Sequence, residues 1–344
     1  MSQPSDSSVV DLSASRDEFQ RAAESYRREL QVHCYRILGS IHESEDAVQE
    51  TMLRAWRSLD SFKGRSSLRS WLYRIATNVC LNAIEKRSNY RRTLPELQGP
   101  PAVMVPEGPA TDVPWLEPYP DAELEGIVDT DPGPQARYEQ REAIQLAFLA
   151  AIQFLPGRQR AALLLHDVVG WSAVETAAIL DMSAAAVNSA LQRARATLEK
   201  HRRMEGRSER EIATEQKRTL LDRYVRSWET KDLDGLVALM KEDAILSMPP
   251  FSEWYRGRDA IRALFAWAWK ALPHAAYRLV ATAANGQPAF AVYGLDTSDS
   301  QWHTCALHVL NVEDDSVSAL TTFRNPDVFR SFGLPTTMCG PSRS

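Results

Sequence analysis

The sequence predicts a multidomain protein in which two all-α modules precede a C-terminal α+β domain. Three observations predict this order. Apolar residues recur at helical spacing in residues 17–92 and again in residues 137–205. A Pro-rich stretch, 93–136, lies between these segments and has nine acidic and no basic residues. In the domain expected at 208–332, helical patterns give way to alternating stretches typical of strands.

The overall composition excludes several classes of protein. The 344 residues include 40 basic and 45 acidic side chains, a net charge of −5. No uninterrupted apolar run reaches the roughly 20 residues of a membrane-spanning helix, and the first residues lack the basic and apolar regions of a signal peptide. The four cysteines have no metal-ligand spacing. We therefore expect a cytoplasmic protein without a membrane segment, metal or cofactor.

The charge is arranged in blocks. Residues 62–92 hold eight basic residues and one acidic residue, a net +7, and residues 190–207 hold six basic and two acidic, a net +4. Blocks of one sign usually mark a partner or a solvated tail. The net −5 of the whole chain therefore does not exclude nucleic acid as a partner of the helical modules.

The first module contains two expected helices with different exposed faces. In the helix over 68–87, Trp71, Arg74, Asn78 and Asn82 fall on one stripe beside the apolar face, and such side chains can hydrogen-bond and stack on unpaired bases. The preceding helix has a mixed acidic and polar face, which would repel phosphate. That face is either solvated surface or a docking site for a basic protein; its central residues are Asp46, Gln49 and Glu50.

The acidic stretch is a linker by composition. One interpretation is a plain solvated tether. A second is a strand of net charge −9 that mimics nucleic acid inside a basic channel. The apolar and aromatic island at 113–121 disfavours a pure tether, because Trp, Leu and Tyr side chains usually pack on a surface.

The second module contains an expected helix-turn-helix at about 172–198. Ser172 with Glu175 predicts a capping box, and Ser183 predicts the start of the second helix. On that helix the apolar residues share one face. The alternative is an ordinary helical hairpin with a solvated basic face. The residues expected to face outward are Asn188, Ser189, Gln192, Arg193 and Arg195.

Both helical modules resemble a known family. The string ESEDAVQETMLRAWRSLDSFKGRSSLRSWLYRIATNVCLNAIEKRS is similar to region 2 of sigma-70 factors of the extracytoplasmic-function group, and residues 138–203 resemble their region 4. The resemblance implies that the chain directs transcription initiation. Its implied partners are core RNA polymerase, through the β′ clamp and the β subunit, and promoter DNA, both double-stranded and melted.

The resemblance also implies roles for single residues. Asp46, Gln49 and Glu50 match positions that grip the β′ clamp. The implied contacts to the minus-ten element are Lys63, Arg65, Ser67, Arg69, Trp71, Arg74, Asn78, Asn82 and Arg87. The implied contacts to the minus-thirty-five element are Asn188, Ser189, Gln192, Arg193 and Arg195. Many relatives carry Lys or Arg where this chain has Asn188, so the resemblance does not supply the promoter sequence.

The C-terminal domain reads as helices followed by several strands, and it resembles the SnoaL-like domain of the nuclear-transport-factor-like fold. Such α+β cones often hold a small-molecule pocket, for which the candidate lining residues are Trp254, Trp267, Tyr293 and His303. We expect this domain to modulate the activity in cis, without catalytic residues. The alternative is an isomerase or cyclase tethered to a DNA-binding module, with Asp243, Asp296, His303 and His308 as candidate bases.

Overall fold

The structure is a computed structural model that describes residues 16–62, 64, 66–86, 91–103, 105–124, 144–205, 214–272 and 274–340. The chain divides into two compact units, a helical one and an α+β one, and it passes between them several times, once within α6 (Leu146–Ile152). Among the described residues, no helix is long and apolar enough to cross a membrane. Lys63, Arg65 and Arg87 lie outside the described residues.

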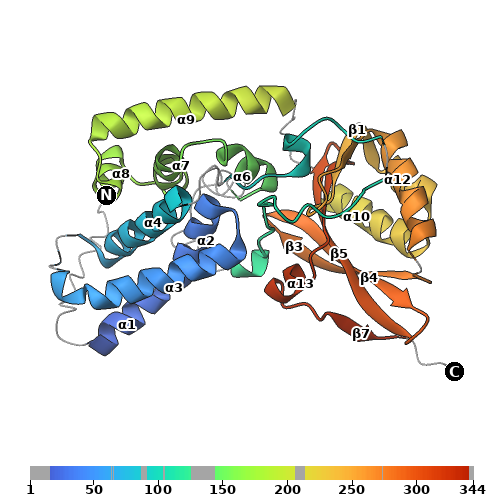
Figure 1. The fold of residues 1–344 in the computed structure, drawn as a ribbon, viewed down its shortest axis with the longest axis horizontal. Helices are drawn as coiled ribbons and strands as arrows, with labels where there is room; N and C mark the ends of the chain where they lie inside the picture. Colours follow the sequence, from blue (N-terminus) through green and yellow to red (C-terminus); the bar gives the residue numbers. More distant parts are fainter. Residues whose placement is uncertain are drawn as a thin grey trace. The chain divides into compact units, whose positions relative to one another are not determined.

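The N-terminal part of the helical unit packs four helices and a short 3₁₀ turn (Figure 1). Gly39, with φ 72°, ends α2, and Ser40 caps α3 by accepting a hydrogen bond from the Glu43 N–H. The buried faces of α2, α3 and α4 pack on one another. The elements are α1 (Arg16–Ser25), α2 (Arg27–Leu38), α3 (Ile41–Arg57), the 3₁₀ turn (Leu59–Ser61) and α4 (Leu68–Lys86).

The same unit continues with the second expected module. After α6 its elements are α7 (Gly157–Leu163), the π-helical η4 (Leu164–Val168), α8 (Ala173–Leu180) and α9 (Ala184–Glu205). Arg160 on α7 is 2% exposed and joins the two modules. Its guanidinium donates to the Ile37 carbonyl at the end of α2, and to the Ile152 carbonyl and Gln153 Oε1.

The second unit contains, in its described residues, a seven-stranded sheet with the order β2-β1-β6-β5-β4-β3 and with β7 paired to β5. β1 and β6 are parallel, and the other pairs are antiparallel. The strands are β1 (Met240–Ser247), β2 (Trp254–Arg256), β3 (Tyr277–Ala284), β4 (Gln287–Asp296), β5 (Gln301–Glu313), β6 (Ser316–Phe323) and β7 (Thr337–Cys339). β3 to β6 confirm the strands that alternation predicts near 277–283, 289–295, 301–312 and 316–323.

Helices of this unit enclose an aromatic core against one face of the sheet (Figure 1). Trp228 of α10 packs edge-on against Phe265 and Trp269 of α12 and against Tyr277 of β3. The helices around this core are α10 (Thr214–Glu229), α11 (Leu233–Ala238) and α12 (Arg258–Ala271), whereas Phe329 of α13 (Asp327–Ser331) packs on Tyr293, outside this core.

The described part of the linker belongs to this α+β unit, which differs from a solvated tether. The predicted island packs: Trp115, Leu116 and Tyr119 are all buried. The Ala102 N–H donates to the Trp254 carbonyl at 2.7 Å, beside the edge strand β2. Apolar burial and backbone pairing, which the acidic composition does not predict, therefore hold residues 91–123 on the C-terminal domain.

Candidate nucleic-acid and polymerase interfaces

The helix-turn-helix is built by local hydrogen bonds. The Glu175 N–H donates to Ser172 Oγ at 3.2 Å and the Ser172 N–H donates to Glu175 Oε2 at 2.8 Å, so the predicted capping box is present. Asp181, with φ 53°, ends α8 in the left-handed region. Ser183 then caps α9 by accepting from the Ala186 N–H at 3.1 Å. These contacts confirm the predicted turn between the two helices.

The second helix separates its two faces as predicted. Val187, Ala190, Leu191 and Ala194 are at most 3% exposed and pack inward. All five candidate DNA-reading residues of this helix are exposed: Asn188, Ser189, Gln192, Arg193 and Arg195. Small polar and arginine side chains on the outer face of a recognition helix suit base edges and phosphates in a major groove.

Two of these five side chains already have partners. The hydroxyl of Ser189 donates to the Ala185 carbonyl of its own helix at 3.0 Å. Arg195 forms a bidentate pair with Asp167, with Nε to Oδ2 at 3.0 Å and Nη2 to Oδ1 at 2.6 Å. Asn188, Gln192 and Arg193 are therefore the residues of this face whose placement depends on α9 alone.

The stripe on α4 is present as expected. Arg74, Asn78 and Asn82 are exposed along one side of the helix. Trp71 is half-buried, because its ring lies 4.8 Å from that of Phe62, between centroids, and tilted by 39°. The indole is thus fixed beside three exposed polar side chains, an arrangement that suits unpaired bases.

Arg69, which the resemblance implies as a minus-ten contact, has partners within the helical unit. Its Nε donates to Glu29 Oε1 at 2.7 Å, and the Tyr73 hydroxyl donates to the same oxygen at 2.8 Å. The guanidinium also lies over the Trp171 ring, 5.3 Å from its centroid. These contacts hold the Arg69 guanidinium in place, although its side chain remains 36% exposed. Ser67 also has a local role, since its Oγ accepts from the Ser70 N–H at 3.1 Å near the start of α4.

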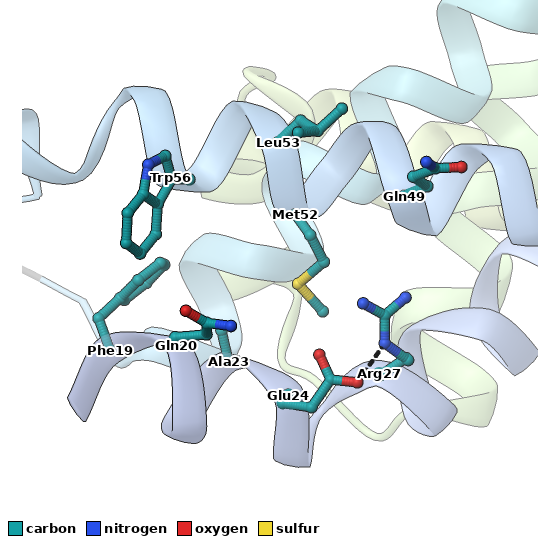
Figure 2. A pocket seen from close by; sticks show the side chains of 9 residues that line it. All are labelled: Phe19, Gln20, Ala23, Glu24, Arg27, Gln49, Met52, Leu53 and Trp56. Carbon is teal, nitrogen blue, oxygen red and sulfur yellow. Dashed lines mark hydrogen bonds and ion pairs between the residues drawn. The ribbon is translucent and has the colours of Figure 1, made fainter. Parts of the chain in front are cut away.

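The acidic and polar face of α3 borders an apolar groove. Asp46 and Gln49 are exposed, and Glu50 pairs with Arg54 at 2.7 Å. The groove has a volume of about 370 Å³ and lies between α1 and α3, with Phe19 and Trp56 at one end and Arg27 at the other (Figure 2). The remaining lining residues are Gln20, Ala23, Glu24, Gln49, Met52 and Leu53.

Helical periodicity alone does not predict this groove, because Met52 and Trp56 recur at helical spacing with the buried Val48 and Ala55. Trp56 is 39% exposed, and Leu53, on the polar face, is 46% exposed. Phe19 on α1 closes the groove, at 6.4 Å between its ring centroid and that of Trp56. The available signal was an amphipathic first helix beginning near Arg16, which gives α3 a second neighbour.

The four candidate pocket residues of the C-terminal domain come from four different elements, and none belongs to the buried aromatic core. Trp254 donates its Nε1–H to the Gly99 carbonyl of the linker at 2.9 Å, and Trp267 is 40% exposed on α12. The Tyr293 hydroxyl donates to the Pro335 carbonyl at 2.8 Å. His303 pairs with Asp299 at 2.7 Å. The aromatic interior is instead a packed core that contains Trp228, Phe265, Trp269, Tyr277 and Phe290.

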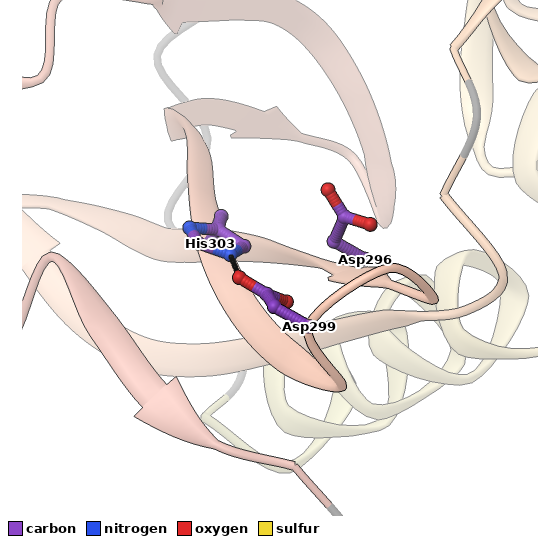
Figure 3. Close-up of side chains that lie close together, drawn as sticks. All are labelled: Asp296, Asp299 and His303. Atoms are coloured by element: carbon purple, nitrogen blue, oxygen red, sulfur yellow. Dashed lines mark hydrogen bonds and ion pairs between the residues drawn. The ribbon is translucent and has the colours of Figure 1, made fainter.

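Of the four candidate bases, two lie together and two lie apart. His308 is 2% exposed inside the aromatic core, where burial lowers its pKa to about 3, and its Nδ1 lies 2.8 Å from the Tyr224 hydroxyl. Asp243 is exposed on β1. Asp296 and His303 lie with Asp299 at the turn between β4 and β5 (Figure 3), where Asp296 Oδ1 accepts from the Ser298 N–H at 2.7 Å. Asp296 and His303 therefore lie within 4.8 Å of each other, whereas Asp243 and His308 lie elsewhere in the domain.

Comparison with known proteins gives matches to all three modules. The matching family models are Sigma-70 region 2 over residues 22–90, Sigma-70 region 4 over residues 145–198 and the SnoaL-like domain over residues 221–320. The ECF RNA polymerase sigma factor SigG of Mycobacterium tuberculosis is 43% identical over 323 residues, which cover 93% of this chain and 85% of that protein. ECF RNA polymerase sigma factor SigW of Bacillus subtilis is 29% identical over 54% of this chain and 90% of its own length.

A solved structure covers all three modules. The crystal structure of the Mycobacterium tuberculosis extracytoplasmic function sigma factor SigJ matches 92% of this chain and 99% of its own, with a TM-score of 0.58 and 20% sequence identity. At that identity the match concerns the fold alone. It agrees with two helical modules followed by an α+β domain.

Proposed function

The chain belongs to the extracytoplasmic-function sigma factors of the sigma-70 family, and on that basis we propose that it directs core RNA polymerase to promoters with two recognition boxes. Recognition of the upstream promoter box is supported by the exposed stripe of Asn188, Gln192 and Arg193 on the second helix of the helix-turn-helix. Arg74, Asn78 and Asn82 on α4 would handle the melted strand of the downstream box, since exposed Asn and Arg can hydrogen-bond to unpaired bases.

The polymerase contact that we infer is the face of α3 with Asp46, Gln49 and Glu50. Its acidic and polar side chains do not suit DNA, but they suit a basic protein surface such as the β′ clamp. The apolar groove that begins at Gln49 supports this inference, because exposed Leu53 and Trp56 give a partner helix apolar anchors. The chain would perform this role in the cytoplasm, with the polymerase.

We further infer that the C-terminal domain modulates the activity in cis by holding the linker. The Tyr119 N–H donates to Asn285 Oδ1 at 2.8 Å, and the Asn285 N–H donates to the Tyr119 carbonyl at 2.9 Å. Asn285 Nδ2 donates to the Ile144 carbonyl at 2.9 Å. One buried side chain thus binds the chain on both sides of residues 125–143. A linker held here is not available to the nucleic-acid channel of the polymerase, so the domain and the channel compete for it.

We propose that a small ligand, bound in the aromatic interior, changes how strongly the C-terminal domain holds the linker. The Nε1–H of Trp269 has no hydrogen-bond partner among the described residues, so it can donate to a carbonyl or carboxylate. The interior borders β3 and β4, whose connecting turn contains Asn285. Binding there would therefore act on the strands that hold the linker.

The test is run-off transcription with purified core polymerase and the full chain, on a promoter taken from start sites mapped after overexpression. Replacing Asn285 by Asp keeps a residue that tolerates its φ of 57° but puts an anionic oxygen opposite the Ile144 carbonyl. We expect the transcript yield to rise. The matched control is Asp315→Asn, at a turn of the same domain with φ 63°. Equal transcript yields from Asn285→Asp and wild type contradict regulation in cis. Absence of transcript with all of these proteins, wild type included, contradicts the proposed sigma activity.

A further inference from the structure

Asp167 lies outside the helix-turn-helix, in the π-helical segment η4 that precedes it. The Val169 N–H donates to the Leu164 carbonyl at 2.9 Å, five residues back, which is the π-helical pattern. Such wide turns are rare and occur frequently at functional sites. In this chain the turn brings the Asp167 carboxylate to the middle of α9, where it meets Arg195.

The geometry of this pair fixes the guanidinium. Both carboxylate oxygens of Asp167 accept from Arg195, at 3.0 Å from Nε and 2.6 Å from Nη2. His166 Nδ1 lies 2.7 Å from Asp167 Oδ1, so the carboxylate is held from a second side. A guanidinium has five N–H donors, and two of them are used here. Three donors therefore remain, on a side chain that is 56% exposed.

Arg195 continues the stripe that the proposed function assigns to the upstream promoter box. It follows Gln192 by three residues and Asn188 by seven, so the three side chains lie on one side of α9. The N-terminal residues of a recognition helix meet the base edges, and Arg195 lies further along the helix. Its side-on edge, Nε with Nη2, is occupied by Asp167. The remaining donors point outward from the end of the guanidinium, which suits a phosphate oxygen.

We propose that Asp167 is a positioning residue that aims Arg195 at a backbone phosphate of the upstream promoter box. This proposal rests on the proposed sigma activity. A free arginine loses rotamer entropy when it is immobilised on a ligand, and the bidentate pair imposes that order before DNA binds. The carboxylate adds a negative charge near the DNA, so its benefit depends on orientation rather than on charge.

The opposing interpretation is that Asp167 masks Arg195. The two interpretations predict opposite signs for the variant Asp167→Asn. This change removes a negative charge, so relief of masking would tighten DNA binding and add a phosphate contact. Loss of positioning would weaken binding and remove one. The dependence of affinity on salt counts these contacts, because each neutralised phosphate contributes about 0.9 to the slope of log K against log salt concentration.

The experiment measures binding of the reconstituted holoenzyme to a duplex carrying a mapped promoter, at KCl concentrations from about 50 to 200 mM. The variants are Asp167→Asn, Arg195→Ala and their combination. We expect each single variant to bind about tenfold more weakly and to lose about 0.9 from the salt slope. We expect the double variant to be no weaker than Arg195→Ala, because Asp167 acts through Arg195.

The matched control is Asp234→Asn, which makes the same charge change at a carboxylate paired with Arg262 in the C-terminal domain; it should leave both quantities unchanged. Tighter or unchanged binding by Asp167→Asn overturns the proposal, and so does weaker binding with an unchanged salt slope, which would indicate a merely structural role. A further loss in the double variant overturns it as well. If wild-type holoenzyme does not bind the promoter, the proposed sigma activity itself fails.

Discussion

The C-terminal domain should lose stability on mild acidification because of one buried histidine. His308 is 2% exposed, and its ring lies 4.9 Å from that of Trp228, between centroids. Burial lowers its pKa from 6.5 to about 3. Above pH 6.5 the residue is neutral in both the folded and the unfolded chain. Below pH 6.5 the unfolded chain binds a proton that the folded chain does not bind until about pH 3, so stability falls as the pH falls.

The size of the loss follows from this interval. Each pH unit below 6.5 costs about 1.4 kcal/mol, so the change from pH 7 to pH 5 costs about 2 kcal/mol. His33 in the helical unit is buried with a pKa of about 3 as well and adds a similar loss there. The variant His308→Gln retains an acceptor for the Tyr224 hydroxyl and removes only the contribution of the C-terminal domain.

The assay is urea unfolding followed by tryptophan fluorescence at pH 7 and pH 5. We expect the decrease in unfolding free energy between the two pH values to be smaller by about 2 kcal/mol in His308→Gln than in wild type. The control is His303→Gln, at an exposed histidine of the same strand, which should retain the wild-type loss. An unchanged loss in His308→Gln would refute the reasoning, because the acid sensitivity would then arise elsewhere.

Two further predictions concern the helical unit. Replacing Arg160 by Met should lower the unfolding free energy by about 3 to 5 kcal/mol, because the Ile37 carbonyl and other buried acceptors lose their donor. Chemical denaturation measures this loss. In the control, replacing the exposed neighbour Arg158 by Met should lower the unfolding free energy by less than about 0.5 kcal/mol. Asp46→Arg should reduce the capture of core polymerase severalfold in a pull-down while Asp222→Arg in α10 does not; equal capture by both contradicts the assigned docking face.

The helix-turn-helix was predictable from the sequence because its determinants are local. Ser172 and Glu175 are three residues apart, and the buried face of α9 follows the helical period. The partners of Arg69 and Arg195 were not predictable. Glu29 is 40 residues from Arg69 and Asp167 is 28 from Arg195, so tertiary packing and a π-helical turn decide both pairs.

The interior of the C-terminal domain shows a second limit. The strands follow from alternation, but the choice of pocket residues required the register. β4 and β5 shift register between Val292 and Tyr293, where β5 passes from Ala306 to Thr304 and leaves Cys305 as an extra residue. Alternation counted from His308 therefore does not extend to His303. A single-sequence pattern does not reveal such a bulge.

The pairing of arginines also changes what the charge blocks mean. Counted in the sequence, the block 62–92 is strongly basic, yet Arg69 is bound to Glu29, and Arg92 is buried and donates to the Trp115 carbonyl and to Glu117. Nonspecific affinity for DNA grows with the number of phosphates that cations neutralise. Arg69 and Arg92, whose donors are used within the protein, contribute less to that number. The free chain should therefore bind DNA weakly, and its hold on a promoter must come largely from the polymerase.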